Sequence, residues 1–136
     1  MYKKILVPID LTDTDHGKET LAIAERLLTD GGEIIALNVV EEVPGYVAAE
    51  LPGTVFDDTL LRARKELEDA VVGAEVNVLA EIKRGSPASA IVATAEQENV
   101  DLVIIASHRP GLADYFLGST AARVVRHAKC PVLVDR

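Results

Sequence analysis

Several kinds of residue and segment are scarce in this sequence, and each scarcity excludes a class of protein. Cys130 is the only cysteine among 136 residues, so no disulfide can form within the chain, and we expect a reducing compartment. No apolar run approaches the roughly 20 residues of a membrane-spanning helix. The apolar stretch 5–9 is too short for the core of a signal peptide. We therefore expect a cytoplasmic protein without a membrane partner.

Positive charge is also in short supply. Lysine and arginine together number 14 against 22 aspartates and glutamates, which gives a formal net charge of -8. Duplex DNA and anionic membranes would on average be repelled by such a chain, so we expect no nucleic-acid partner. A small phosphate ligand can still bind locally through backbone N–H groups and one or two cations.

The motifs of several enzyme classes are missing. The sequence has no G-x4-G-K-[ST] phosphate loop, no G-x-G-x-x-G after the first apolar run and no G-x-S-x-G elbow. No cysteine–histidine cluster has the spacing of a zinc site. We therefore expect a protein that is not an enzyme and has no catalytic residues and no metal site. No residue can be named as the base for slow hydrolysis of a bound phosphate compound.

Short apolar runs are present, and they alternate with stripes of apolar residues at helical spacing. Aromatic residues make up only 4% of the chain, so the core must come from Val, Ile, Leu and Ala. The pattern predicts strands over 3–9, 34–40, 75–82, 102–106 and 131–134. Helices are expected over 15–29 and 54–72, from Ser86–Pro87 onward, and from about 119 to 128. We expect Gly31–Gly32 to end the first helix. Residues 41–53 are expected to form a long loop.

This alternation predicts one α/β domain over residues 1–136. Strand–helix–strand repeats give a doubly wound five-stranded parallel sheet with helices on both faces. Ligands of such sheets lie at the carboxyl ends of the strands, where the winding direction reverses. That position corresponds to the ends of the first and fourth strands, near Asp10 and near Ser107–His108.

Three segments resemble one family, the universal stress proteins. They are Lys4-Ile5-Leu6-Val7-Pro8-Ile9-Asp10, then Arg84-Gly85-Ser86-Pro87, and a tail from Ser107-His108-Arg109-Pro110 through Gly118-Ser119-Thr120 to Cys130-Pro131-Val132-Leu133-Val134. The tail is similar to the F- and G-type bacterial members. The resemblance implies an adenine-nucleotide alpha-hydrolase-like fold with strand order 3-2-1-4-5, and a homodimer that pairs through the C-terminal strand.

The phosphate loop departs from the form found in ATP-binding members of that family, G-x2-G-x9-G-[ST]. Ala106 and Arg109 stand where the first two glycines are expected, and the stretch from Arg109 to Gly118 is one residue shorter. The last element, Gly118-Ser119, is intact. The F- and G-type subgroup is associated with ATP binding despite this altered loop, so the resemblance implies that ATP, with magnesium as a candidate companion ion, is the cofactor.

The residues themselves indicate how a nucleotide would be held. The first turn of the last helix, with Gly118, Ser119 and Thr120, offers unpaired N–H groups to a phosphate, although simple N-capping by the serine is the alternative. Asp10 could accept hydrogen bonds from ribose hydroxyls, or it could only start the turn before the first helix. The resemblance places the backbone of Val39 against the adenine edge.

Two loop residues complete the predicted site. Arg109 could contact the phosphates in place of the lost glycine, or it could be an exposed arginine paired with Asp114. His108 is expected to position the loop or meet a phosphate, and His16 is expected at the surface. The predicted nucleotide-binding residues are therefore Pro8, Ile9, Asp10, Val39, Ala106, Ser107, His108, Arg109, Gly118, Ser119 and Thr120.

Three functions are compatible with these observations. The first is a nucleotide-binding regulatory protein, in which ATP changes shape or dimerisation. The second is a dimeric stress-response interaction module without nucleotide, which the altered loop favours. The third is a nucleotide-hydrolysing or nucleotide-transferring enzyme, whose turnover would collapse when His108 or Asp10 is changed. The sequence favours the first.

Overall fold

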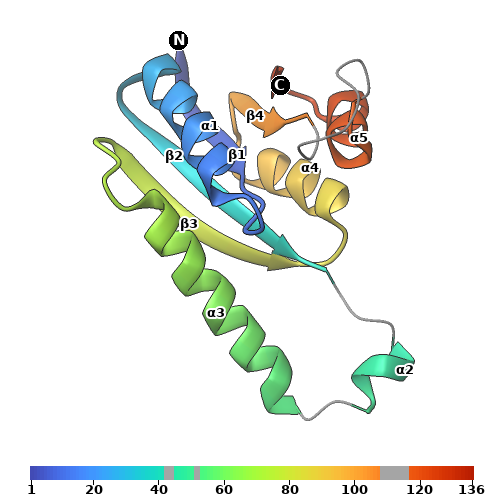
Figure 1. Ribbon diagram of the computed structural model, residues 1–136. Helices are drawn as coiled ribbons and strands as arrows, with labels where there is room; N and C mark the ends of the chain where they lie inside the picture. Colours follow the sequence, from blue (N-terminus) through green and yellow to red (C-terminus); the bar gives the residue numbers. More distant parts are fainter. Residues whose placement is uncertain (42–44, 51–52, 108–116) are drawn as a thin grey trace.

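Strands and helices alternate along the chain in the predicted order (Figure 1). The computed structural model describes residues 1–41, 45–50, 53–107 and 117–136. The elements are β1 (Tyr2–Pro8), α1 (Thr14–Leu27), β2 (Leu28–Val40), α2 (Gly45–Ala48), α3 (Gly53–Val71), β3 (Asn77–Arg84), α4 (Pro87–Gln97), β4 (Leu102–Ala106), α5 (Ser119–His127) and β5 (Val132–Asp135).

The five strands form one parallel sheet in the order β3-β2-β1-β4-β5. The expected α/β fold and its strand order are therefore confirmed. The chain builds outward from β1 to β3 and then returns to add β4 and β5 on the other side. The winding direction thus reverses between β1 and β4, which is the predicted position of the ligand crevice.

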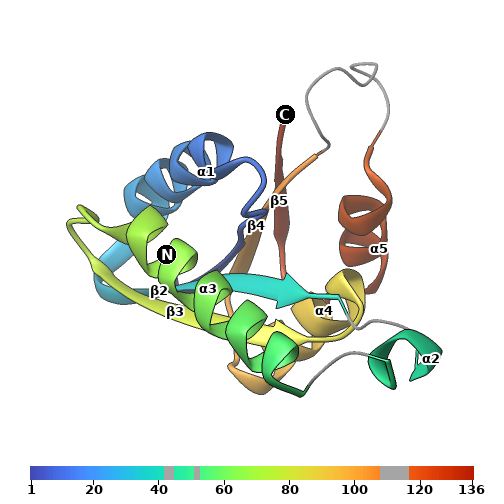
Figure 2. The ribbon, with the colours of Figure 1, turned by 60° about the horizontal axis from the view of Figure 1, so that its bottom comes forward.

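Helices cover both faces of the sheet, as Figure 2 shows. On one face, α1 and α3 pack their buried residues, such as Leu21 and Leu67, against Ile5, Val7 and Ile104. On the other face, α4 and α5 pack on a second apolar cluster. Its fully buried members include Leu6, Ile35, Val103 and Val124. Because the central strands are buried on both faces, they read in the sequence as continuous apolar runs.

The first helix ends earlier than the sequence pattern predicts. α1 stops at Leu27, Leu28 already has extended dihedrals, and β2 begins there, so the predicted termination by Gly31–Gly32 is wrong. The two glycines lie in β2, within a register irregularity opposite the start of β1. Gly31 has φ of +80°, and a Cβ on Gly32 would lie 2.7 Å from the Lys3 carbonyl oxygen. They permit a bulge and a close backbone approach.

Two further boundaries differ from the prediction. Within the expected loop 41–53, Gly45–Ala48 forms the short helix α2, which Figure 1 shows away from the sheet. The third strand lies about two residues later than predicted, because a turn with Gly73 at φ of +93° follows α3. Neither shift changes the strand order.

Candidate functional site

Three predicted residues lie at the same level across adjacent strands. Pro8 pairs with Leu37, so Asp10, two residues further along, is level with Val39. Leu6 pairs with Val103, so Asp10, four residues further along, is level with Ser107. The register of the parallel sheet thus brings the predicted residues of β1, β2 and β4 to one carboxyl-end edge.

The ladder between β1 and β4 is short. Its paired residues are Ile5 with Leu102 and Leu6 with Val103, and the ends of both strands extend beyond them. Pro8 and Ala106, two of the predicted site residues, lie in these ends, where β1 and β4 are not paired with each other. On its other side, β1 stays bonded to β2, because the Ile9 N–H donates to the Leu37 carbonyl over 2.8 Å. The sheet therefore divides between β1 and β4, at the switch point.

Asp10 is exposed and organises the turn after β1. Its Oδ1 accepts hydrogen bonds from the Thr12 N–H at 2.9 Å and from the Thr12 hydroxyl at 2.6 Å. The N-terminal cap of α1 is Asp13, whose Oδ1 accepts from the His16 N–H. Asp10 therefore has the turn-forming role that the sequence left open as an alternative. Within the described part of the chain, its second oxygen, Oδ2, has no hydrogen-bond donor.

The backbone of Val39 projects past the end of β1. Peptide groups alternate in direction along a strand, and Val40 accepts from Gly85 on the β3 side, so the N–H and C=O of Val39 face the β1 side. In a continued ladder the Ile9 carbonyl would bond to the Val39 N–H. The Asn38 side chain bonds to that carbonyl instead, with Nδ2 at 2.9 Å. Asn38 is a polar residue at this edge of the sheet that the sequence analysis missed.

A backbone hydrogen bond joins the residue after β4 to the residue before α5. The Gly118 N–H donates to the Ser107 carbonyl over 2.6 Å, although the two residues are eleven positions apart (118 − 107). The Ser107 N–H in turn donates to the Asp135 carbonyl of β5 over 2.8 Å. Ser107 is only 2% exposed. The predicted residues Ser107 and Gly118 are thus in direct contact.

No side chain of the described residues caps the first turn of α5. Gly118 is the N-cap residue, and Ser119 is the first helical residue, so the alternative of a capping serine is wrong. Gly118 has φ of −57°, a value that any residue adopts, so the backbone angle does not require glycine there. Ser119 is exposed and Thr120 half-buried. Uncapped N–H groups at a helix start are suited to bind an anion.

His108 and Arg109 lie outside the described residues, as do Pro110 and Asp114. Their predicted roles stay predictions.

A polar link between α1 and β5 was also missed. The Thr20 hydroxyl lies 3.1 Å from Asp135 Oδ2, and His16 Nε2 lies 3.4 Å from the same oxygen. The expectation of a surface position for His16 is therefore wrong, because the residue lies half-buried against Asp135. The only sequence signal is the spacing of His16 and Thr20, which puts both on one helix face.

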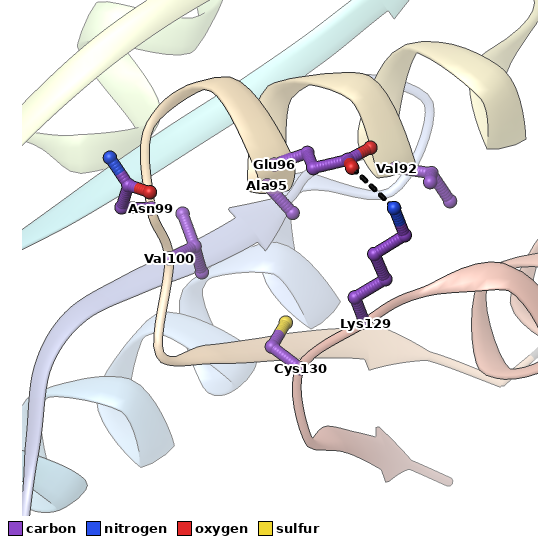
Figure 3. Close-up of a pocket in the computed structure, with 7 residues that line it drawn as sticks. All are labelled: Val92, Ala95, Glu96, Asn99, Val100, Lys129 and Cys130. Carbon is purple, nitrogen blue, oxygen red and sulfur yellow. Dashed lines mark hydrogen bonds and ion pairs between the residues drawn. The ribbon is translucent and has the colours of Figure 1, made fainter.

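Two surface hollows lie away from the predicted residues. One of about 170 Å³ lies between α4 and the segment before β5, where the Lys129 Nζ bonds to Glu96 over 2.7 Å (Figure 3). Cys130 lines it, and burial raises the pKa of its thiol. The other, of about 400 Å³, lies between α3 and β3 beside Arg64 and Lys83. Neither is lined by a predicted nucleotide-site residue.

Two absences hold for the described ranges. There, no group of three histidine, cysteine, aspartate or glutamate side chains is arranged to hold a metal ion. No helix in these ranges is both long and apolar enough to cross a membrane.

Comparison with known proteins gives consistent matches over the full length. A model described as the universal stress protein family matches residues 1–136. Universal stress protein G of Shigella flexneri is 31% identical over 145 residues, covering 100% of both chains. The solved structure of hypothetical protein MJ0577 is 30% identical, covers 98% of this chain and 95% of its own, and has a TM-score of 0.83.

Two more distant structures share the fold. A universal stress protein in complex with cAMP is 20% identical, with a TM-score of 0.62, over 99% of this chain and 97% of its own. An Arabidopsis thaliana family protein with AMP bound is 19% identical, with a TM-score of 0.59, over 97% and 90%.

Proposed function

The chain belongs to the universal stress protein family, and from this premise we propose that it is a regulatory protein that binds ATP at the carboxyl end of its sheet. The observation that carries the proposal is the uncapped start of α5. It is bonded to Ser107, which is level with Asp10 and Val39 across the divided sheet. A phosphate group, a ribose and a base therefore each have a suitable partner at one edge.

Each part of the nucleotide has an assigned partner in this proposal. The N–H and C=O of Val39 bind the adenine edge, and the free Oδ2 of Asp10 accepts from a ribose hydroxyl. The N–H groups of Ser119 and Thr120, with their hydroxyls, bind phosphate oxygens, and Gly118 lets the phosphate approach closely. Further contacts come from Pro8, Ile9, Ala106 and Ser107, from Arg109, which supplies positive charge to the phosphates, and from His108, which positions the loop or meets a phosphate.

The class of ligand has separate support. Proteins of the same fold hold cAMP and AMP, so an adenine nucleotide is the class that this site fits best. ATP, with magnesium as its companion ion, is the more specific proposal, and it rests on the polar start of α5. No described cluster of acidic side chains would hold the metal by itself, so the phosphates would supply most of its ligands.

In this proposal the protein is a cytoplasmic regulator that acts by binding its ligand and not by catalysing a reaction. β5 is an edge strand of four half-buried residues, so it can pair with the same strand of a second copy to form a homodimer. A dimeric interaction module without nucleotide is the second candidate, and the replacement of two loop glycines by Ala106 and Arg109 favours it.

Mass spectrometry of freshly purified, gently denatured protein tests the proposal directly. We expect ATP or ADP to be released in near-stoichiometric amount. In a parallel thermal-shift experiment, ATP at 100 times its Kd should stabilise the protein by about 2.7 kcal/mol. No retained nucleotide and no stabilisation by ATP, ADP, AMP or cAMP would reject nucleotide binding and favour the interaction module.

Gly118→Ala locates the site. Because φ of Gly118 suits alanine, the variant should fold, with a loss of about 0.5–1 kcal/mol since alanine is a poorer N-cap residue than glycine. The added methyl group would keep a phosphate from the first N–H groups of α5, so we expect ATP affinity to fall about tenfold. An unchanged Kd would place the nucleotide elsewhere.

A further inference from the structure

Asp135 touches both halves of the proposed site. Its carbonyl oxygen accepts from the Ser107 N–H at 2.8 Å, and Ser107 in turn bonds to Gly118 at the start of α5. Its carboxylate Oδ2 lies 3.1 Å from the Thr20 hydroxyl of α1. One residue at the end of β5 therefore holds the phosphate half of the site with its backbone and α1 with its side chain.

The contact between Thr20 and Asp135 is buried on the helix side. Thr20 is 2% exposed and lies beside the core residue Leu21. Its single hydroxyl proton has two acceptors, the His16 carbonyl at 3.0 Å and Asp135 Oδ2 at 3.1 Å. Apolar contacts between α1 and the sheet are not directional, whereas a buried hydrogen bond works only in a narrow range of geometry. The contact therefore ties α1 to the end of β5 at one defined point.

α1 is also bonded to the Asp10 turn, whose other side is held to β2 through Ile9. Asp13 caps the helix through the His16 N–H, and the Asp13 N–H bonds back to the Asp10 carbonyl over 3.1 Å. His16 adds a second contact to the same network, since its imidazole lies between the carboxylates of Asp13 and Asp135 at 4.0 and 3.4 Å. A continuous chain of polar contacts thus runs from Asp10 to Gly118.

We infer that Thr20 and Asp135 are positioning residues of the nucleotide site. They keep the ribose-binding turn after β1 at a fixed distance from the phosphate-binding start of α5, across the division between β1 and β4. Neither residue needs to touch the nucleotide. Their effect on affinity rests on the proposed function, whereas the coupling between the two loops does not.

The central variant is Thr20→Val, which keeps the shape of the side chain and removes the hydroxyl. We expect the Kd for ATP, measured by calorimetry, to rise about fivefold, the loss expected for one hydrogen bond of ordinary strength. Thr20→Ser retains the hydroxyl and should restore the wild-type Kd. Asp135→Asn, which removes the charge, should weaken ATP binding to a similar extent.

Asp101→Asn is the matched control. Asp101 Oδ2 also accepts hydrogen bonds from backbone N–H groups, those of Lys3 at 2.8 Å and Lys4 at 3.0 Å. These bonds lie at the opposite end of the sheet. The variant should lower stability and leave the Kd unchanged. Wild-type affinity in both Thr20→Val and Asp135→Asn would overturn the inference, as would an equal loss of affinity in Asp101→Asn.

Hydrogen exchange on the nucleotide-free protein separates this inference from the proposed function. In Thr20→Val, the Ser107 and Gly118 amides should exchange faster relative to the core amide of Leu6, and in Asp101→Asn they should not. If the wild-type protein binds no adenine nucleotide but this exchange pattern appears, the proposed function fails and the coupling stands. Unchanged exchange at both amides would reject the coupling.

Discussion

The two ends of the sheet are held together in different ways. At the amino end, β1 and β4 are joined by the backbone and by one carboxylate. Asp101 accepts from the N–H groups of Lys3 and Lys4, and its own N–H donates to the Lys4 carbonyl over 2.9 Å. Gly32 of β2 lies so close to the Lys3 carbonyl that a Cβ would clash. This end is closed by short-range backbone contacts.

At the carboxyl end, the ladder between β1 and β4 stops at Leu6 and Val103, whereas backbone bonds continue on the outer sides, from Ile9 to Leu37 and from Ser107 to Asp135. Two side chains add links beside this division: Asn38 of β2 bonds to Ile9, and Asp135 of β5 bonds to Thr20 of α1. Backbone ladders fix strands to each other, whereas side-chain links leave peptide groups between them available. The comparison teaches that the amino end of the sheet, which is closed, holds β1 and β4 together. The carboxyl end, which we call the open end, can therefore leave peptide groups available to a ligand.

Leu6→Ala should have the largest effect, because it removes a buried side chain that packs in the core between the two ends of the sheet. Leu6 is 0% exposed, at the last paired position between β1 and β4. We expect a loss of about 3 kcal/mol in the free energy of unfolding, measured by urea denaturation. Leu61→Ala, at a residue 67% exposed, is the control and should change stability by less than about 0.5 kcal/mol. Equal losses would contradict the assigned core.

Asp101→Asn should weaken the closed end alone. A carboxylate that accepts two backbone hydrogen bonds is replaced by a neutral group, and the site is exposed to solvent, so we expect a loss of about 1 kcal/mol. Urea denaturation measures it. An unfolding free energy equal to that of the wild type would show that the ladder alone closes this end.

Asn38→Ala tests the open end with a smaller effect on stability. The variant removes the donor to the Ile9 carbonyl, which can partly recover by bonding to water or to the Val39 N–H. We expect a loss below about 1 kcal/mol together with an approximately threefold weaker ATP affinity, since the Val39 N–H is then drawn away from the adenine. Calorimetric titration and urea denaturation together decide. A loss of stability without a change in Kd would limit Asn38 to sealing the sheet.

The smallest effect is expected at Cys130, near the closed end. Burial raises the pKa of its thiol, so at pH 7 a smaller fraction is thiolate than in a free thiol. Alkylation by iodoacetamide should therefore be slower than that of glutathione at pH 7, and its rate should keep rising at pH values where the glutathione rate has levelled off. The same measurement in urea is the control. Faster alkylation than glutathione would indicate a reactive centre at this end.

Much of the fold could be predicted from local patterns. The continuous apolar runs of β1, β2 and β4 indicate strands covered on both faces, and the alternation with helices predicts a parallel sheet. The end of α1 could not be predicted, because Gly31 and Gly32 signal a helix stop as readily as a bulge. Here the close approach of Lys3, from another strand, determines the outcome.

For the candidate site, the sequence predicted positions only where topology alone places a residue. The level of Asp10, Val39 and Ser107 follows from the ends of neighbouring parallel strands. Asn38 has a backbone carbonyl as its partner, and Thr20 has a partner 115 residues away. The spacing of His16 and Thr20 puts both on one helix face but does not identify Asp135, so these partners could be found only from the three-dimensional arrangement.

Two backbone hydrogen bonds connect the start of α5 to β5. The Gly118 N–H donates to the Ser107 carbonyl, and the Ser107 N–H donates to the Asp135 carbonyl. Because side chains take no part in these two bonds, every residue except proline keeps the donors at positions 107 and 118. The side chains at both positions can therefore be exchanged to alter the chemistry of this edge while the helix keeps its backbone anchor.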